Sequence, residues 1–171
     1  DHGGTIDKYV GDAIMAFWNA PLDDADHAAH AAHAALAMTD KLAELNARWR
    51  APDGEFPELR EDVRFGIGLA TGECLVGNFG SEQRFDYSAL GDCVNVASRM
   101  QDATKSYGAT ILAAQSTRDR IPELAWLEID RTSLRGRAEM TGIFLLAGDE
   151  SFRRSHDFAE LAKRHGTASL A

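Results

Sequence analysis

The residue types that could do chemistry lie in two short segments, KYVGDAIMAFW at residues 8–18 and RFDYSALGDCVNVASRM at residues 84–100. In the first, Asp12 follows a glycine at a predicted turn, and carboxylate oxygens are the ligands that Mg²⁺ and Mn²⁺ prefer. In the second, Asn95 and Arg99 are four residues apart and share one face of a predicted helix. A guanidinium can fork onto phosphate oxygens, and an amide can bind a ribose oxygen or a developing charge. The first segment therefore indicates a metal-binding site, and the second indicates a phosphate-binding site.

Taken one at a time, these residues also have ordinary structural explanations. Asp12 could be a turn aspartate, since Gly-Asp is a weak signal as a bare dipeptide. Arg99 could form a surface salt bridge, and Asn95 could be a core or capping amide. Three histidines spaced by three residues at 27–33 could suggest a metal. However, this spacing drifts around a helix and no cysteine or carboxylate pattern accompanies it, so we interpret them as a polar helix face.

The composition is that of one ordinary globular domain. The chain has 171 residues, of which 44% are hydrophobic and 26% charged. The net charge of -9 argues against general binding to nucleic acid or to an anionic membrane, because both reward clustered Lys and Arg. Cys74 and Cys93 are not in a C-x-x-C pair, and we expect both to be reduced thiols in a cytoplasmic domain.

No apolar run is long enough to span a bilayer, and no signal peptide or initiator Met is visible. The chain opens abruptly at DHGGTID, so we expect it to be a fragment of a longer protein. Residues 5–10 and 13–18 alternate like two strands, and a glycine first in the two-residue loop Gly11-Asp12 fits a type II′ hairpin. Apolar residues at helical spacing, including Met38, Leu42 and Leu45, predict a long helix over 26–50.

The remaining elements are predicted from the same patterns. They are an exposed loop at 51–62, a second hairpin of strands 63–70 and 73–79, a loop before a helix at 91–106, a strand at 109–113, a short helix at 116–121, strands at 126–130, 132–135 and 141–146, and a polar, loosely helical tail after Gly148. Strands that alternate with two long helices predict an α+β fold, with one sheet and the helices packed on one face.

The stretches K-x-x-G-D-A-x-M-A and G-D-x-V-N-V-A-S-R-M resemble the catalytic domain of the class III adenylate and guanylate cyclases. The resemblance implies a ferredoxin-like βαββαβ sandwich, the nucleotide cyclase palm, over residues 1–147, followed by a polar tail at 148–171. The family's usual first segment, an F-x-D-I-x-G-F-T-like stretch, is absent. The resemblance would put the first strand and first helix upstream of Asp1.

The resemblance also implies a role for each candidate residue. Asp12 would be the family's second metal aspartate, and Asn95 and Arg99 would be its transition-state pair. Lys8 and Ser88 would read the purine: lysine goes with adenine, whereas guanylate cyclases carry glutamate at that position, and Ser88 is closest to the threonine variant. The L-R-G-R stretch resembles the family's triphosphate-binding V-K-G-K, which assigns that role to Arg135, with Arg137 as a plausible substitute.

The function implied is an adenylate cyclase that converts ATP to cyclic AMP and pyrophosphate with two Mg²⁺ or Mn²⁺ ions per site. The resemblance implies a head-to-tail homodimer in which Asp12 meets the other site residues across the interface. It also implies an upstream sensor or membrane module, with the domain in the cytoplasm. With one of two metal aspartates, residues 1–171 alone should be inactive.

Three other functions stay open. A guanylate cyclase is disfavoured by Lys8. A diguanylate cyclase is disfavoured because its G-G-D-E-F turn is V-G-D-A-I here. A non-catalytic dimerisation or nucleotide-sensing module is favoured by the missing first aspartate and disfavoured by Lys8, Asn95 and Arg99.

Overall fold

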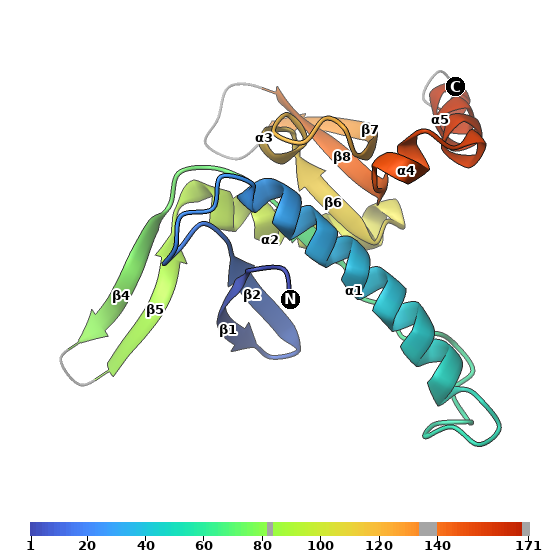
Figure 1. Ribbon diagram of the computed structural model, residues 1–171, viewed down its shortest axis with the longest axis horizontal. Helices are drawn as coiled ribbons and strands as arrows, with labels where there is room; N and C mark the ends of the chain where they lie inside the picture. Colours follow the sequence, from blue (N-terminus) through green and yellow to red (C-terminus); the bar gives the residue numbers. More distant parts are fainter. Residues whose placement is uncertain (82–83, 134–139, 169–171) are drawn as a thin grey trace.

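A computed structural model describes residues 1–81, 84–133 and 140–168 and shows an α+β fold (Figure 1). In chain order the elements are β1 (Thr5–Val10), β2 (Ala13–Phe17), α1 (His27–Trp49), β3 (Ile67–Leu69), β4 (Leu75–Ser81), β5 (Arg84–Leu90), α2 (Asp92–Tyr107), β6 (Ile111–Ala114), α3 (Gln115–Arg118), β7 (Ala125–Ser133), β8 (Met140–Gly148), α4 (Glu150–Arg153) and α5 (His156–Ala168). The α+β class predicted from the sequence is confirmed.

Four strands form the central sheet, in the order β3-β6-β8-β7. Strand β3 runs parallel to β6, and the other two pairs are antiparallel. All four residues of β6 are buried, and they alternate between two separate apolar cores. Ile111 and Ala113 pack in the core that contains the alanines of α1, whereas Leu112 and Ala114 pack with Val96 of α2. Because successive side chains of a strand point to opposite faces, α1 and α2 cover opposite faces of the sheet.

The prediction that the helices share one face is therefore wrong for α2. Glycines explain why α2 can lie so close to the sheet on its own face. A side chain at Gly68 of β3 would collide with the backbone of α2, at the carbonyl of Ala97 and the amide of Gln101. All four residues of β6 are apolar, so its sequence does not show which helix will cover which face of the strand.

Helix α1 packs on the sheet through its first half only. Its buried side chains there are Ala28, Ala32 and Ala35, a stripe at helical spacing whose small size allows close approach. Met38, which the apolar pattern marks as part of the buried face, is 47% exposed. The second half of the helix runs beyond the sheet (Figure 1). It is fixed there by Asn46, whose amide both donates to and accepts from the backbone of Val63 at 2.9 Å.

The first hairpin matches its prediction. Strands β1 and β2 are antiparallel and joined by the two residues Gly11 and Asp12. Gly11 has φ +63°, and Asp12 is not among the residues with positive φ, as a type II′ turn requires.

The second hairpin is not the predicted one. Strand β4 pairs with β5 rather than with β3, and the residues before α2 form a strand rather than a loop. The sequence RFDYSAL alternates apolar and polar residues as a half-buried strand does, and this signal was missed. Strand β3 pairs instead with β6, a parallel neighbour more than 40 positions later in the chain. Such pairing is set by which backbone edges meet in the folded chain.

The two hairpins form separate two-stranded sheets within the described part of the chain. The β4–β5 hairpin projects from the body as an arm (Figure 1). The β1–β2 hairpin lies against the base of this arm, with the rings of Phe17 and Tyr87 5.9 Å apart between centroids.

The later elements differ from their predictions in β7 and in α3, which ends at Arg118 rather than at residue 121. Strand β7 is a single strand with irregular pairing to β8, not two strands at 126–130 and 132–135. The polar tail is helical, as predicted. His165 of α5 contacts the carbonyl oxygen of Glu128 in β7 at 2.7 Å. The division of the chain into a domain at 1–147 and a tail at 148–171 stays a prediction.

Candidate functional site

Asp12, the predicted metal ligand, lies exposed at the tip of the β1–β2 hairpin. The tight turn forces it outward, since its neighbour Gly11 supplies the positive φ that closes the loop. Among residues 1–81, 84–133 and 140–168, no group of three or more His, Cys, Asp or Glu residues could hold a metal ion. Asp12 therefore fits one ligand of a hard cation, but these residues do not complete a two-metal site.

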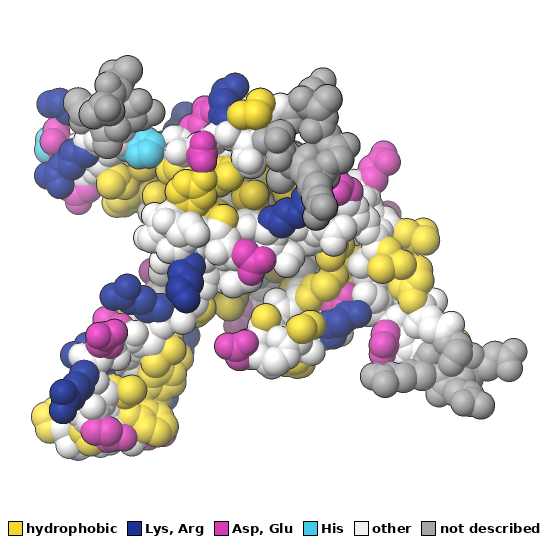
Figure 2. Space-filling view, turned by 180° about the vertical axis from the view of Figure 1, so that it is seen from behind, with side chains coloured by type: hydrophobic (Ala, Val, Ile, Leu, Met, Phe, Trp, Pro, Cys, Tyr) yellow, Lys and Arg dark blue, Asp and Glu magenta, His cyan; other side chains and the backbone are white. Residues whose placement is uncertain are grey.

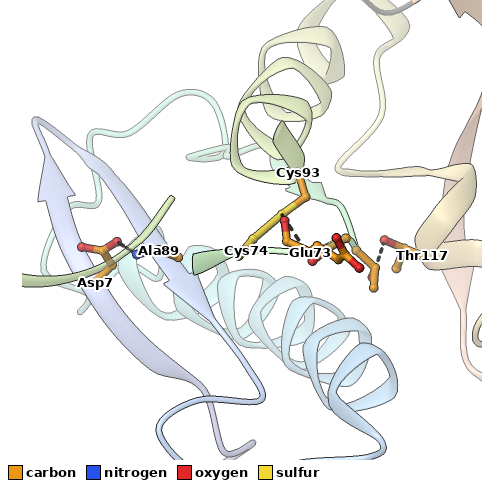
Figure 3. Close-up of a disulfide and its surroundings, with 8 residues drawn as sticks. Asp7, Glu73, Cys74, Ala89, Cys93 and Thr117 are labelled. Atoms are coloured by element: carbon orange, nitrogen blue, oxygen red, sulfur yellow. Dashed lines mark hydrogen bonds between the residues drawn. A yellow bond between two sulfur atoms is a disulfide. The ribbon is translucent and has the colours of Figure 1, made fainter. Parts of the chain in front are cut away.

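Lys8 and Ser88, the predicted base-reading residues, are brought together through a residue that the sequence did not single out. Asp7 accepts a hydrogen bond from Ser88 Oγ at 2.7 Å on its Oδ2. The backbone N–H of Ala89 donates to the same oxygen at 3.4 Å. Lys8 Nζ forms an ion pair with Asp7 Oδ1 at 3.3 Å. Figure 3 shows the carboxylate of Asp7 directed from β1 toward Ala89 of β5.

A bulge in β1 makes this arrangement possible. Neighbouring residues of a regular strand point to opposite faces. Here Ile6 pairs with Ala16 and Lys8 pairs with Met15, so Asp7 is the extra residue of a β-bulge. Bulges re-aim side chains and are frequent beside active sites. No pattern in the sequence predicts this bulge. However, the charged pair Asp7-Lys8, which precedes the turn with the predicted metal ligand, could have marked Asp7 as a candidate site residue.

The carboxylate of Asp7 is held in its charged form. Its side chain is 1% exposed. Burial alone raises the pKa of this group, but the hydrogen bond from Ser88, the neighbouring Lys8 and the N–H of Ala89 together outweigh burial and lower the pKa below its ordinary value. An ionised carboxylate only accepts hydrogen bonds, so the direction of the bond from Ser88 is fixed.

Asn95 and Arg99 lie on α2, as predicted, and share one face. Val96 and Met100, which follow them in the chain, are buried in the core, so the helix is anchored on that side. Both predicted site residues are exposed. Their side chains make no hydrogen bond or ion pair with the part of the chain that the structure describes, which leaves the amide and the guanidinium open to a ligand. The N-cap residue of the helix is Gly91, and Asp92 is its first helical residue.

Cys74 and Cys93 form a disulfide that joins the segment before β4 to the first turn of α2 (Figure 3). The expectation of two reduced thiols is therefore wrong for this structure, because the fold brings together residues that are 19 positions apart. A cavity of about 440 Å³ borders Cys93 and is lined by two carboxylates, Glu73 and Asp92. Asn95 and Arg99 are not among its lining residues, so it is not the predicted phosphate site.

Arg135 and Arg137, the predicted triphosphate ligands, lie outside the described residues. The structure thus brings together Lys8 and Ser88 and presents Asn95 and Arg99 on one helix. It leaves Asp12 without a hydrogen bond or ion pair to any other predicted site residue in the described ranges.

An α+β fold with an aspartate on a tight hairpin, and with an exposed Asn–Arg pair on a helix, is compatible with a domain that binds phosphorylated nucleotides. Residues 5–147 match the family described as the adenylate and guanylate cyclase catalytic domain. The chain belongs to this family, and the resemblance noted in the sequence is confirmed.

Relatives of known name support this membership. The chain is 37% identical over 148 residues to adenylate cyclase 1 of Rhizobium meliloti, a match that covers 86% of the chain and 21% of that protein. It is 37% identical over 114 residues to an adenylate cyclase of Anabaena cylindrica, covering 67% of the chain and 21% of that protein. The chain therefore spans about a fifth of the length of these relatives.

Solved structures show the same fold. The adenylyl cyclase CyaB from P. aeruginosa is similar with a TM-score of 0.72 at 29% identity, covering 86% of this chain and 74% of that one. The guanylyl cyclase Cya2 is similar with a TM-score of 0.71 at 30% identity, covering 86% and 72%. The predicted cyclase palm fold is thereby confirmed. Among the described residues, no helix is both long and apolar enough to cross a membrane.

Proposed function

We propose that this chain is the catalytic domain of an adenylate cyclase, which converts ATP to cyclic AMP and pyrophosphate. The observation that carries the proposal is the cluster of Lys8, Asp7 and Ser88, in which one carboxylate holds both the exposed ammonium of Lys8 and the buried hydroxyl of Ser88. Two relatives named adenylate cyclase support the choice of ATP. The similarity to the guanylyl cyclase Cya2 keeps GTP as the alternative substrate.

The choice of ATP rests on the hydrogen-bonding edges of the purines. Adenine presents an acceptor at N1 and an amino donor at N6. Guanine presents the opposite pair, a donor at N1 and an acceptor at O6. Lys8 can only donate, so it suits adenine N1 and opposes the N1–H of guanine. A buried polar group left without its partner costs about 1–3 kcal/mol, which is enough to bias the choice of base.

The remaining candidate residues would act on the ribose and the phosphates. In this proposal Arg99 stabilises the charge that develops on the phosphate during cyclisation, and Asn95 orients the ribose. Arg135 binds the triphosphate, with Arg137 as a substitute. Both Asn95 and Arg99 are exposed, so a nucleotide can reach them.

A divalent cation, Mg²⁺ or Mn²⁺, is the cofactor that the family implies, and Asp12 is the residue proposed to hold it. When bound, such ions activate the attacking hydroxyl and neutralise the leaving pyrophosphate. Mg²⁺ keeps its waters unless several anionic oxygens compete for it, so one carboxylate holds it weakly. We accordingly propose that residues 1–171 alone have little activity, and that a second aspartate must come from another segment.

We propose a head-to-tail homodimer as the active assembly. The surfaces that support it are the hairpins, where large apolar side chains are exposed on both. On β1–β2 and its turn they are Ile6, Tyr9, Val10 and Ile14, and on β4–β5 they are Leu75, Phe85, Tyr87 and Leu90. Figure 2 shows hydrophobic side chains gathered along the β4–β5 arm. Contiguous apolar surface of this kind marks an interaction site.

An upstream sensor module and a cytosolic location for this ATP-consuming domain are part of the same proposal.

A direct assay tests the proposal. The full-length protein that contains residues 1–171 is incubated with Mn²⁺ and with ATP or GTP in separate reactions, and the cyclic nucleotide is measured. Cyclic AMP as the main product supports the proposal. Cyclic GMP as the main product would overturn the choice of base, and no product from either nucleotide would leave a nucleotide-sensing module as the better function.

A further inference from the structure

We propose that Asp7 is a specificity-determining residue that acts through Ser88 and Lys8, by fixing which atoms of this pair donate and which accept. The inference rests on the proposed function, since it concerns how the same site distinguishes adenine from guanine. Its basis is the buried carboxylate of Asp7, which contacts the neighbouring Lys8 and also Ser88, 81 positions from Asp7 in the sequence.

The hydroxyl of Ser88 has one proton and two lone pairs. Its oxygen lies 2.7 Å from Asp7 Oδ2, so the proton is committed to the carboxylate. What Ser88 can then offer a ligand is acceptor capacity alone. An acceptor matches the N6 amino group of adenine and opposes the O6 carbonyl of guanine. Without Asp7, a serine hydroxyl would rotate to suit either base.

Lys8 is held by the other oxygen of the same carboxylate. Asp7 Oδ1 has no hydrogen-bond partner among the described residues, and Lys8 Nζ lies 3.3 Å from it. The lysine side chain is 43% exposed, so its ammonium can still reach a ligand. The ion pair restricts a flexible side chain that would otherwise sample many rotamers. Asp7 thus fixes Lys8 as a donor and Ser88 as an acceptor toward the base.

A purely structural role is the alternative to be excluded. Asp7 also ties β1 to β5, and losing such a tie would lower stability and activity toward both nucleotides together. A specificity role has a different signature, because it changes the ratio of kcat/KM for ATP to that for GTP. The charged state of the carboxylate supports the second role, since only an acceptor can fix the direction of the Ser88 proton.

The test replaces Asp7 by its neutral isostere in the full-length protein. In the Asp7→Asn variant, the side-chain NH₂ can donate to Ser88 Oγ and release the hydroxyl proton toward the base. We expect the ATP-to-GTP ratio of kcat/KM to fall by about tenfold or more, because a site that hydrogen-bonds its substrate loses discrimination when donors and acceptors mismatch. The Asp53→Asn variant, the same change on an exposed loop, should keep the ratio.

A second comparison asks whether Asp7 acts through Ser88. In a Ser88→Ala background, Asp7→Asn should change the ratio much less than it does alone, since the hydroxyl that it orients is gone. Should Asp7→Asn fail to fold, Ser88→Ala alone carries the test and should lower the same ratio. An unchanged ratio in a folded Asp7→Asn or Ser88→Ala protein, with wild-type cyclic AMP synthesis intact, overturns the inference only. A wild-type protein inactive on both nucleotides overturns the proposed function and this inference with it.

Discussion

The hydroxyl of Ser88 donates a 2.7 Å hydrogen bond to the carboxylate of Asp7, although 81 positions separate the two residues in the chain. This contact connects the first hairpin, which also carries Asp12, to the β5 strand that leads into α2. It therefore links the proposed metal-binding element to the element that presents Asn95 and Arg99. The predictions below test this site and the fold that carries it.

Exchanging both base-reading residues should weaken the use of ATP sharply. In a Lys8→Glu and Ser88→Cys double variant, an acceptor would face adenine N1, and a weak thiol would face N6. We expect kcat/KM for ATP to fall by about a hundredfold or more, since donors and acceptors then meet the wrong purine edge. Steady-state assays with ATP and GTP measure the effect. Undiminished use of ATP would show that these residues do not read the base.

Removal of Arg99 should act mainly on the rate of the chemical step. The Arg99→Ala variant is expected to lower kcat by about a hundredfold, with a smaller change in KM, as for other preorganised groups that stabilise developing charge. Lys105→Ala removes an exposed cation from the last turn of the same helix and serves as the control. A large rise in KM with normal kcat would instead make Arg99 a residue that binds the substrate in its ground state.

Mixing two inactive variants should restore activity if the site is shared between subunits. An Asp12→Asn chain and an Arg99→Ala chain each lack one proposed residue. In their heterodimer, one of the two sites keeps both residues, and one site of a symmetric pair can then turn over. Cyclic AMP synthesis after mixing is the measurement, with each variant alone as the control. Heterodimers that form, as shown by differential tagging, but stay inactive would rule out the shared site.

The contact between Asn46 and the backbone of Val63 should contribute strongly to stability. Asn46→Ala would leave the N–H and the carbonyl oxygen of Val63 without their partner. We expect the free energy of unfolding to fall by about 1–3 kcal/mol. Urea unfolding followed by circular dichroism measures it, and Gln101→Ala, which removes an exposed amide from α2, is the control. Equal midpoints for the two variants would contradict the structural role of Asn46.

The pair of His30 and Asp24 at the start of α1 should titrate as a unit. Their side chains lie 2.8 Å apart; the hydrogen bond that His30 Nδ1 donates to Asp24 Oδ2 raises the pKa of His30, and the same bond lowers the pKa of Asp24. The contribution of His30 is complete below its unfolded pKa and is lost as pH rises through its raised folded pKa. That of Asp24 is present above its unfolded pKa and is lost as pH falls through its lowered folded pKa. The pair therefore stabilises the fold most at pH values above the unfolded pKa of Asp24 and below the unfolded pKa of His30.

Titration of the histidine ring protons by NMR checks this pair. The pKa of His30 should lie above its ordinary value and move back toward it in Asp24→Asn. The pKa of His27 lies below its ordinary value, mainly because the ring is partly buried, although the charge of Asp24 raises it. Asp23→Asn, the same change one residue earlier, should leave His30 unaltered. A His30 titration that is identical in the wild type and in Asp24→Asn would contradict the pairing.

The sequence by itself determined the features that depend on neighbouring residues. The Gly11-Asp12 turn, the long helix α1 and the helix that carries Asn95 and Arg99 were all predicted, because turn residues and helical periodicity act over a few positions. The family was also visible, since its two motifs are contiguous stretches of the chain. That α1 packs on the sheet through its first half was not predicted. Its buried residues there are alanines, whereas the prediction relied on large apolar residues.

Only the tertiary structure decided which distant segments meet. An alternating strand pattern is the same whichever strand becomes its partner, so it could not tell that β4 pairs with β5 and that β3 pairs with β6. The bulge at Asp7 and the contact of its carboxylate with Ser88 have the same origin. Backbone hydrogen bonds and buried charges are satisfied by whatever the fold brings near them, and that proximity is a property of the whole chain rather than of any short stretch of it.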